Sequence, residues 1–287
     1  MEKAMPKILT QTQIDKYNED GFLCPLDVFS AEKARSYLDE LEAFEESQRN
    51  PANAKDFSAR KGKGFNFKPH LLFPWVDEIV HNPIILDYVE DLIGPDIRLW
   101  NMAVWPKDAH DPAFVSWHQD ATYFGLNPAT QVAVWIALAD APVEAGCMEV
   151  IPGSHKLGQL HHSEIRAEHS LLSRGQTIDV PYDKSRTEFM PVKAGQCSIH
   201  DTFLIHGSGP NNTDFRRVGM ALSYIPASSK AQSNIRLRAM MMRGEDKWGN
   251  FDDEPRPKVA YGEAEQEAHR HSVSLFQELN AEQALKY

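Results

Sequence analysis

A histidine and an aspartate separated by one residue, His118 and Asp120, are the first residues whose spacing could serve chemistry. Side chains two residues apart on an extended segment point to the same side, so both could bind one metal ion. The triplet alone is weak evidence, because it could equally be a polar pair in a loop. A second histidine, His206, is expected to end an apolar strand at 203–205 and to precede a glycine-rich turn at 207–210.

Together these residues would form a triad of two histidines and one carboxylate. Such a triad leaves three positions of an octahedral metal open and is typical of non-haem Fe(II) oxygenases. A bidentate keto acid and O2 could occupy those positions. Arg216 or Arg217 could bind the distal carboxylate of the keto acid, with Ser208 as an assisting hydroxyl. Because adjacent side chains of a strand point to opposite faces, one of the two arginines should lie at the surface.

Longer motifs surround these residues in a fixed order. They are WHQDATYF at 117–124, VWIAL at 134–138, GCM at 146–148, IPGSH at 151–155 and HGSGPNNTD at 206–214, followed by Arg216 and Arg217. In this order and spacing they resemble the phytanoyl-CoA dioxygenase family of Fe(II)- and 2-oxoglutarate-dependent oxygenases, which are oxidoreductases. The resemblance extends over about 7–257, most of the chain.

The resemblance implies a mainly β fold with a double-stranded β-helix (jelly-roll, cupin-like) core. It implies Fe(II) as the metal, with 2-oxoglutarate and O2 as co-substrates, and it implies the catalytic iron ligands His118, Asp120 and His206. The co-substrate residues would be Arg217, favoured over Arg216 by its spacing from the second histidine, with Ser208, Trp135 and Lys107. Related halogenases replace the carboxylate with a small residue. Because Asp120 is present, hydroxylation with release of succinate and CO2 is expected.

The substrate can be assigned only by class. Candidate pocket residues mix cationic, amide and aromatic groups and favour a small polar or anionic molecule over a long acyl chain; they are Asn66, Lys68, His70, Asn101, Trp105, Tyr123 and Phe124. The alternative is that the aromatic residues belong to the core and that Lys68 is exposed.

Two other classes of function stay open. One is a non-catalytic jelly-roll protein that binds a ligand or metal at a relic site, against which the triad, Arg217 and Ser208 argue. The other is a zinc-dependent hydrolase that uses the same three ligands and a water molecule. A zinc enzyme has no need of an arginine placed for a keto acid. Consumption of 2-oxoglutarate and analysis of the bound metal would separate these classes.

The elements that must position the site change in character near residue 96. Residues 1–95 should form mostly helical cover, with helices at 10–20, 30–48 and 83–93, a strand at 22–26, and a loop or lid at 50–64. Short apolar runs then predict strands at 97–105, 131–138, 147–151, 196–199, 203–205 and 218–225. Because no helix-length apolar period separates them, an antiparallel jelly roll is expected over 96–230. A C-terminal cover at 231–287, with a helix at 262–282, completes a single domain, 1–287.

Several other residues that could bind metal or react are expected to be structural. His155 should lie in a turn, and His200 should have a turn or hydrogen-bonding role. A polar segment contains further histidines that should be solvated or at a pocket rim; they are His161, His162 and His169. Cys147, Cys197 and the methionines at 240–242 are expected to pack in the core.

Composition excludes several classes of protein. The 287 residues, 42% hydrophobic and 25% charged, are typical of a globular chain. The formal net charge of −11 would repel phosphate backbones, so nucleic acid is not an expected partner. No apolar run approaches the roughly 20 residues of a membrane span, and no signal peptide is recognised. With three cysteines, which suit a reducing compartment, these features predict a cytoplasmic protein with a small-molecule substrate. The sequence does not indicate an oligomeric state.

Overall fold

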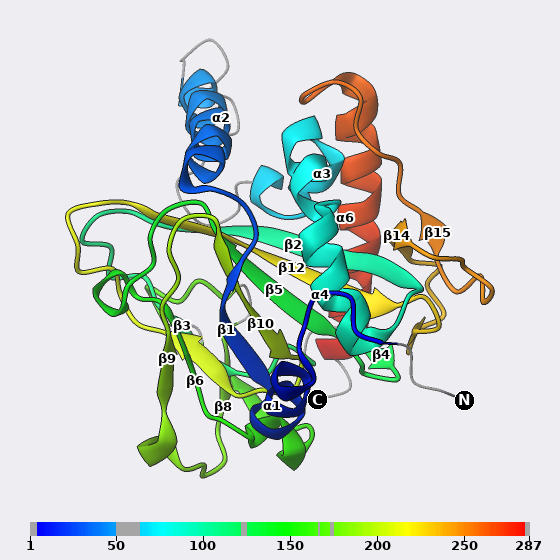
Figure 1. The fold of residues 1–287 in the computed structure, drawn as a ribbon. Helices are drawn as coiled ribbons and strands as arrows, with labels where there is room; N and C mark the ends of the chain where they lie inside the picture. Colours follow the sequence, from blue (N-terminus) through cyan, green and yellow to red (C-terminus); the bar gives the residue numbers. More distant parts are fainter. Residues whose placement is uncertain (1–4, 50–63, 122–124, 166, 173–174, 285–287) are drawn as a thin grey trace.

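The computed structural model describes residues 5–49, 64–121, 125–165, 167–172 and 175–284. Two mainly antiparallel sheets form a jelly-roll core (Figure 1). In spatial order the large sheet contains β1 (Phe22–Asp27), β10 (Gln196–Asp201), β5 (Val132–Ala137), β12 (Arg217–Pro226), β2 (Ile97–Lys107), β14 (Arg238–Arg243) and β15 (Asp252–Asp253). The small sheet contains β3 (Val115–His118), β11 (His206–Ser208), β6 (Met148–Val150) and β9 (Glu188–Met190). Two short ribbons pair β4 (Leu126–Asn127) with β13 (Lys230–Ala231) and β7 (His162–Glu164) with β8 (Gln176–Ile178).

Helices lie mainly at the two ends of the chain. They are α1 (Gln11–Asp20), α2 (Ala31–Arg49), α3 (Pro74–Val80), α4 (Pro83–Ile93) and α6 (Glu263–Ala284). Short 3-10 segments occur at Gly64–Asn66, Pro69–Leu71, Val143–Ala145, Ser154–Leu157 and Lys184–Arg186. Figure 1 shows α3 and α4 against the large sheet, with α6 beside them. The predicted mainly β fold with helical ends is confirmed.

The sequence predicted most helix ends because their caps are local. Thr10 and Gln13 form a capping box at the start of α1, and Gly21, with φ of 85°, ends it. Asn82 caps α4, which begins at Pro83 and ends at Gly94. The helices predicted at 10–20, 30–48, 83–93 and 262–282 are confirmed as α1, α2, α4 and α6. Helix α3 was not predicted, because its seven residues are too few to show an apolar period.

Alternation gives the large sheet two different faces. Val104, Ile136 and Met220 belong to the main hydrophobic cluster, which includes Ile79 and Val89 from the helices. The intervening residues of β2, β5 and β12 point the other way, toward the small sheet. Along the β2–β12 pair, Trp105 lies opposite Gly219, Ala103 opposite Ala221, and Asn101 opposite Ser223. This second face forms one wall of the pocket described below.

The predicted strand at 203–205 is wrong. Leu204 donates its backbone N–H to Asp201 O, and Phe203 donates to the Asp201 side chain, so this apolar run is a turn. Leu204 and Ile205 are apolar because the turn is buried. His206 therefore begins β11 instead of ending a strand.

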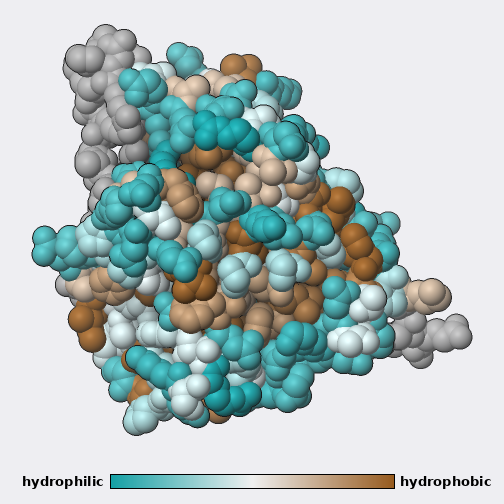
Figure 2. All heavy atoms as spheres, turned by 60° about the vertical axis from the view of Figure 1, so that its left-hand side comes forward, coloured by the Kyte–Doolittle hydropathy of each residue, from teal (hydrophilic) through white to brown (hydrophobic). Residues whose placement is uncertain are grey.

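Apolar side chains reach the surface in the middle of the face shown in Figure 2, and polar side chains surround them. Within the described part of the chain, no helix has both the length and the apolar composition needed to cross a bilayer.

Candidate active site

His118, Asp120 and His206 lie together at one end of the small sheet. His118 ends β3 and is the direct antiparallel neighbour of His206 on β11. One donor atom from each of the three side chains lies within 4.8 Å of the others. The Nε2 atoms of His118 and His206 lie 3.5 and 3.8 Å from Asp120 Oδ1. The three donors thus converge as the ligands of one metal ion would.

A hydrogen bond of the same kind orients both imidazoles. Nδ1 of His118 lies 2.8 Å from Ser116 O, and Nδ1 of His206 lies 2.9 Å from Leu204 O. Because a carbonyl oxygen can only accept, Nδ1 carries the proton in each case. In the neutral ring, Nε2 then directs a lone pair toward Asp120, which is the tautomer that a metal ligand needs.

The charges of the site also suit a cation. Burial, and then the neighbouring rings of His118 and His200, hold the pKa of His206 well below its ordinary value. Burial alone would raise the pKa of Asp120, but contacts with His118 and His200 outweigh it and hold that pKa well below its ordinary value. A neutral imidazole and an ionised carboxylate are the forms that bind a metal.

Gln119, the residue between His118 and Asp120, makes hydrogen bonds through both its backbone and its side chain. Gln119 is fully buried. Its side-chain amide donates to Gly158 O and Phe203 O at 2.8 and 2.7 Å, and its Oε1 accepts from Leu160 N at 2.8 Å. Its backbone N–H donates to His162 Nε2 at 3.0 Å. These bonds fix the backbone that carries His118 and Asp120.

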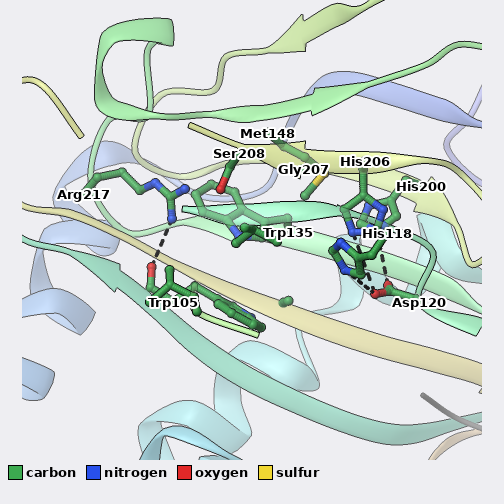
Figure 3. A pocket seen from close by; sticks show the side chains of 13 residues that line it. Trp105, His118, Asp120, Trp135, Met148, His200, His206, Gly207, Ser208 and Arg217 are labelled. Carbon is green, nitrogen blue, oxygen red and sulfur yellow. Dashed lines mark hydrogen bonds and ion pairs between the residues drawn. The ribbon is translucent and has the colours of Figure 1, made fainter. Parts of the chain in front are cut away.

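A pocket between the two sheets extends away from the triad (Figure 3). The triad lies at one end, Arg217 at the other, and Trp105 and Trp135 between them. The lining residues are Trp105, Val115, His118, Asp120, Trp135, Met148, Leu171, His200, His206, Gly207, Ser208, Arg217 and Ala221.

Arg217 is almost fully buried and contacts no carboxylate among the described residues. Its Nη1 donates to Trp105 O at 3.1 Å and its Nη2 to Gly146 O at 2.6 Å, while Nε has no hydrogen-bond partner. Its guanidinium lies over the Trp135 ring, 4.9 Å from the centroid. Burial lowers the pKa of Arg217 to about 10, so it remains charged at neutral pH. Arg217 is thus a buried cation with no counter-ion among the described residues.

A glycine makes room for Trp135. A Cβ built on Gly219 would lie 2.0 Å from Cζ2 of the Trp135 ring. The indole therefore lies directly over the glycine of the neighbouring strand, where a larger residue would displace it.

Lys107 adds a second buried cation near Arg217. Its Nζ donates to Ser208 Oγ at 2.7 Å and to Gly209 O. Burial, followed by the charge of Arg217, lowers the pKa of Lys107 to about 7. Because Ser208 Oγ accepts from Lys107, its own O–H remains available to donate to a ligand.

Comparison with known proteins agrees with this geometry. The family model described as "Phytanoyl-CoA dioxygenase (PhyH)" matches residues 17–219, more than half of the chain. The chain belongs to the phytanoyl-CoA dioxygenase family. As a member, it is an Fe(II)- and 2-oxoglutarate-dependent dioxygenase.

Individual relatives cover most of the chain. A protein of Stutzerimonas stutzeri named "probable alpha-ketoglutarate-dependent hypophosphite dioxygenase" is 26% identical over 224 residues, 75% of this chain and 78% of the relative. An ectoine dioxygenase of Bordetella bronchiseptica is 24% identical over 234 residues, 75% of each chain. The solved structure of a non-heme monooxygenase, ThoJ, in its apo form has 30% identity and a TM-score of 0.83, and the match covers 96% of this chain and 99% of ThoJ.

The residues present fit the cofactor and co-substrate of this family. Two imidazoles and one carboxylate form the donor set that non-haem iron prefers and leave other positions open. The unpartnered Nε of Arg217 and the buried charge of Lys107 suit the carboxylate of a keto acid.

Arg216, the alternative to Arg217, points away from the pocket. Its guanidinium forms ion pairs with Glu45 at 2.8 Å and with Asp108 at 3.2 Å. The two adjacent arginines thus lie on opposite faces, as the strand geometry predicted, and Arg217 is the one inside.

The place of His200 differs from the predicted turn. It lies in β10, not in a turn, and its buried ring faces the triad. His200 Nε2 is 3.4 Å from Asp120 Oδ2, and its ring centroid is 4.6 Å from that of His206. Alternation along β10 is the sequence feature that could have predicted this position. His200 and Ser198 share one face of the strand, and they lie opposite Ala133 and Trp135 of β5.

The other histidines and the sulfur residues have structural surroundings. His155 contacts Asn18 O from a 3-10 segment, as predicted. His162, predicted to be solvated or at a pocket rim, is instead partly buried, accepts from the backbone N–H of Gln119 and does not line the pocket. Cys147 and Cys197 are buried, and Met240 packs in the main hydrophobic cluster, as predicted.

Two predicted substrate contacts are wrong. Lys68 and His70 are buried away from the pocket, where Lys68 Nζ lies 2.6 Å and His70 Nε2 lies 3.0 Å from the Glu254 carboxylate. Asn66 does not line the site cavities either, whereas Asn101 and Trp105 do. Tyr123, Phe124 and most of the predicted lid at 50–64 lie outside the described residues.

Proposed function

We propose that this protein binds Fe(II) through His118, Asp120 and His206 and hydroxylates a small molecule at the expense of 2-oxoglutarate and O2. Arg217 and Ser208, with Lys107, would hold the co-substrate carboxylate. The products would be an alcohol, succinate and CO2. The presence of Asp120 supports hydroxylation over halogenation, since the carboxylate occupies a ligand position that halide would need.

One observation carries the proposal. A single pocket contains three convergent metal donors at one end and an uncompensated buried arginine at the other. The arginine matters because the triad alone would also suit a zinc hydrolase, which needs no cation at the far end of the pocket.

Each side chain has a defined task in this reaction. Bound Fe(II) would supply the oxidising chemistry with O2 and the keto acid. The carbonyls of Ser116 and Leu204 hold the two imidazoles with Nε2 unprotonated. Arg217 binds the distal carboxylate and so sets the direction of the co-substrate in the pocket, while Trp105 and Trp135 exclude water between the two ends.

The test is anaerobic titration of the protein with Fe(II) and 2-oxoglutarate, followed in the visible region. We expect a weak metal-to-ligand charge-transfer band that Asp120→Ala abolishes. Arg217→Met should weaken 2-oxoglutarate binding at least tenfold and leave Fe(II) binding intact, because Arg217 lies at the far end of the pocket. Arg216→Met is the matched control and should retain wild-type affinity. Absence of the band in the wild type, or its persistence in Asp120→Ala, would refute the proposal.

A further inference from the structure

A second cavity adjoins the metal site on the side of α6. It shares five residues with the pocket of Figure 3, which are Trp105, His118, Asp120, Leu171 and Ala221. It adds Phe67, Asn101, Ala103, Leu172, Ser223, Phe276 and Asn280. This cavity, here called the outer chamber, meets the pocket of Figure 3 at His118 and Asp120, so it is the space next to the triad that is available to the molecule that is oxidised.

The walls of the outer chamber are apolar and aromatic. The rings of Phe67 and Phe276 lie with centroids 4.9 Å apart, and Trp105 belongs to both cavities. Leu172 is buried, and Leu171 lies beside it. Such walls favour a ligand with a flat or ring-sized apolar body.

Two amides, Asn101 and Asn280, line the outer chamber together with the hydroxyl of Ser223. Asn101 is about nine-tenths buried, at 6% exposure, and its Nδ2 has no hydrogen-bond partner. Asn280 of α6 has an unpartnered Oδ1. A β-bulge explains the orientation of Asn101: Ser223 lies opposite Asn101 and Tyr224 opposite Leu99, so Trp100 is an extra residue in the strand. Both residues line the outer chamber, and each has a buried polar atom without a hydrogen-bond partner.

Charge is confined to the other end of the site. Among the described residues that line the outer chamber, only His118 and Asp120 are ionisable, and both belong to the triad. The two unpaired cations, Lys107 and Arg217, lie in the co-substrate region, and Lys68 is paired with Glu254. No described residue of the outer chamber outside the triad would provide a counter-ion for a charged substrate, and burying an unpaired charge is strongly unfavourable.

We infer that the outer chamber takes an uncharged substrate with a ring-sized apolar body and a carboxamide-like group that pairs with Asn101 and Asn280. This inference rests on the proposed function. In the balanced reaction a substrate C–H bond becomes C–OH. One oxygen atom of O2 enters the alcohol and the other enters succinate, while 2-oxoglutarate is oxidised and loses CO2.

The test compares matched pairs of small molecules that differ only in charge. Aryl-acetamides, such as indole-3-acetamide, and the corresponding aryl-acetates are screened by ligand-observed NMR in the presence of saturating 2-oxoglutarate, so that Lys107 and Arg217 are already occupied by a carboxylate. We expect the amides to bind at least tenfold more tightly than the acids. Asn101→Leu and Asn280→Leu should each weaken amide binding at least tenfold. Asn212→Leu, on an exposed residue that does not line the outer chamber, is the control and should change nothing.

Preference for the acids, binding by none of the amides, or unchanged amide binding in both chamber variants would overturn the inference. The charge-transfer band with Fe(II) and 2-oxoglutarate is recorded for each variant. It should remain, which shows that the variant is folded and that the co-substrate end is intact. Loss of the band in the wild type would instead refute the proposed function, so the two failures are distinguishable.

Discussion

At the scale of single residues, the site separates a metal end from an anion end. His118, Asp120 and His206 present two imidazoles and one carboxylate, whereas Lys107 and Arg217 present positive charge. The lowered pKa of Lys107 makes the anion end sensitive to pH. Arg217 stays charged across the neutral range, so a change in anion binding near pH 7 would come from the titration of Lys107.

We predict that 2-oxoglutarate binds more weakly as pH rises from 6 to 9. Below about pH 7 Lys107 already carries its proton, and above it the ligand must bind together with a proton. Affinity should therefore fall by up to about tenfold per pH unit above pH 7, the slope for uptake of one proton. Calorimetric titration of Mn(II)-loaded protein under nitrogen measures it. Lys107→Met should bind 2-oxoglutarate weakly, with an affinity that does not change with pH. Lys156→Met, at the surface, should show the same dependence of affinity on pH as the wild type. A flat wild-type profile would contradict the assignment.

The convergence of the predicted triad and the place of Arg217 in the pocket could be predicted, because a local sequence motif contains each of these residues. His200 was not, because no motif marks it and only pairing of β10 with β5 brings it to Asp120. Lys68 was misassigned for a similar reason. Its partner Glu254 is 186 residues away, and the sequence around Lys68 gives no sign of it.

At the scale of elements, the register of β12 between β2 and β5 builds the pocket wall. It places Gly219 beneath Trp135 and Arg217 beside the same ring. Helix ends followed from caps in the sequence. The start of β11 could not be predicted from the sequence, because the buried turn before it is as apolar as a strand. Hydrophobicity reports burial, and burial alone does not distinguish a strand from a turn.

We predict that Gly219→Ala destabilises the protein by about 1–3 kcal/mol, the usual cost of overpacking. The new methyl group would overlap the Trp135 ring, so the indole must move and 2-oxoglutarate affinity should fall as well. Urea denaturation measures the first effect, and titration of the charge-transfer band measures the second. Gly64→Ala is the control, because a Cβ there would meet no atom within 4 Å. Equal stability of the two variants would show that Trp135 does not occupy this position.

At the scale of the whole molecule, a buried hydrogen-bond network joins residues that are far apart in sequence on one side of the jelly roll. Lys68 donates to Trp100 O in the β-bulge and to Glu254 near the C-terminal helix, with Lys68 Nζ 2.9 and 2.6 Å from the two oxygens. His269 of α6 contacts Phe67 O at 2.8 Å. This buried network holds Phe67 and the bulge in place and thereby shapes the outer chamber.

We predict that Glu254→Gln costs about 3–5 kcal/mol of unfolding free energy, because it leaves the buried Lys68 charge unpaired. Burial alone would raise the pKa of Glu254, but Lys68 and His70 outweigh it and lower the pKa to about 2. Since the folded-state pKa is the lower one, this stabilisation is complete above about pH 4.5 and is lost as pH falls toward 2.

Thermal and acid unfolding of Glu254→Gln and of the exposed control Glu245→Gln test this prediction. The control carboxylate lies in a surface ion pair and should cost less than about 1 kcal/mol. If both variants unfold alike, the buried pair does not stabilise the fold.

The two unpaired cations also link the amount of co-substrate to the persistence of the enzyme. Lys107 and Arg217 are buried together, and without an anion between them each lowers the stability of the folded chain. A dianion that binds only the folded state relieves this repulsion and shifts the folding equilibrium by mass action. A cell rich in the keto acid would therefore keep more of this protein folded and protected from proteolysis. Metabolic supply would set the lifetime of the enzyme as well as its rate.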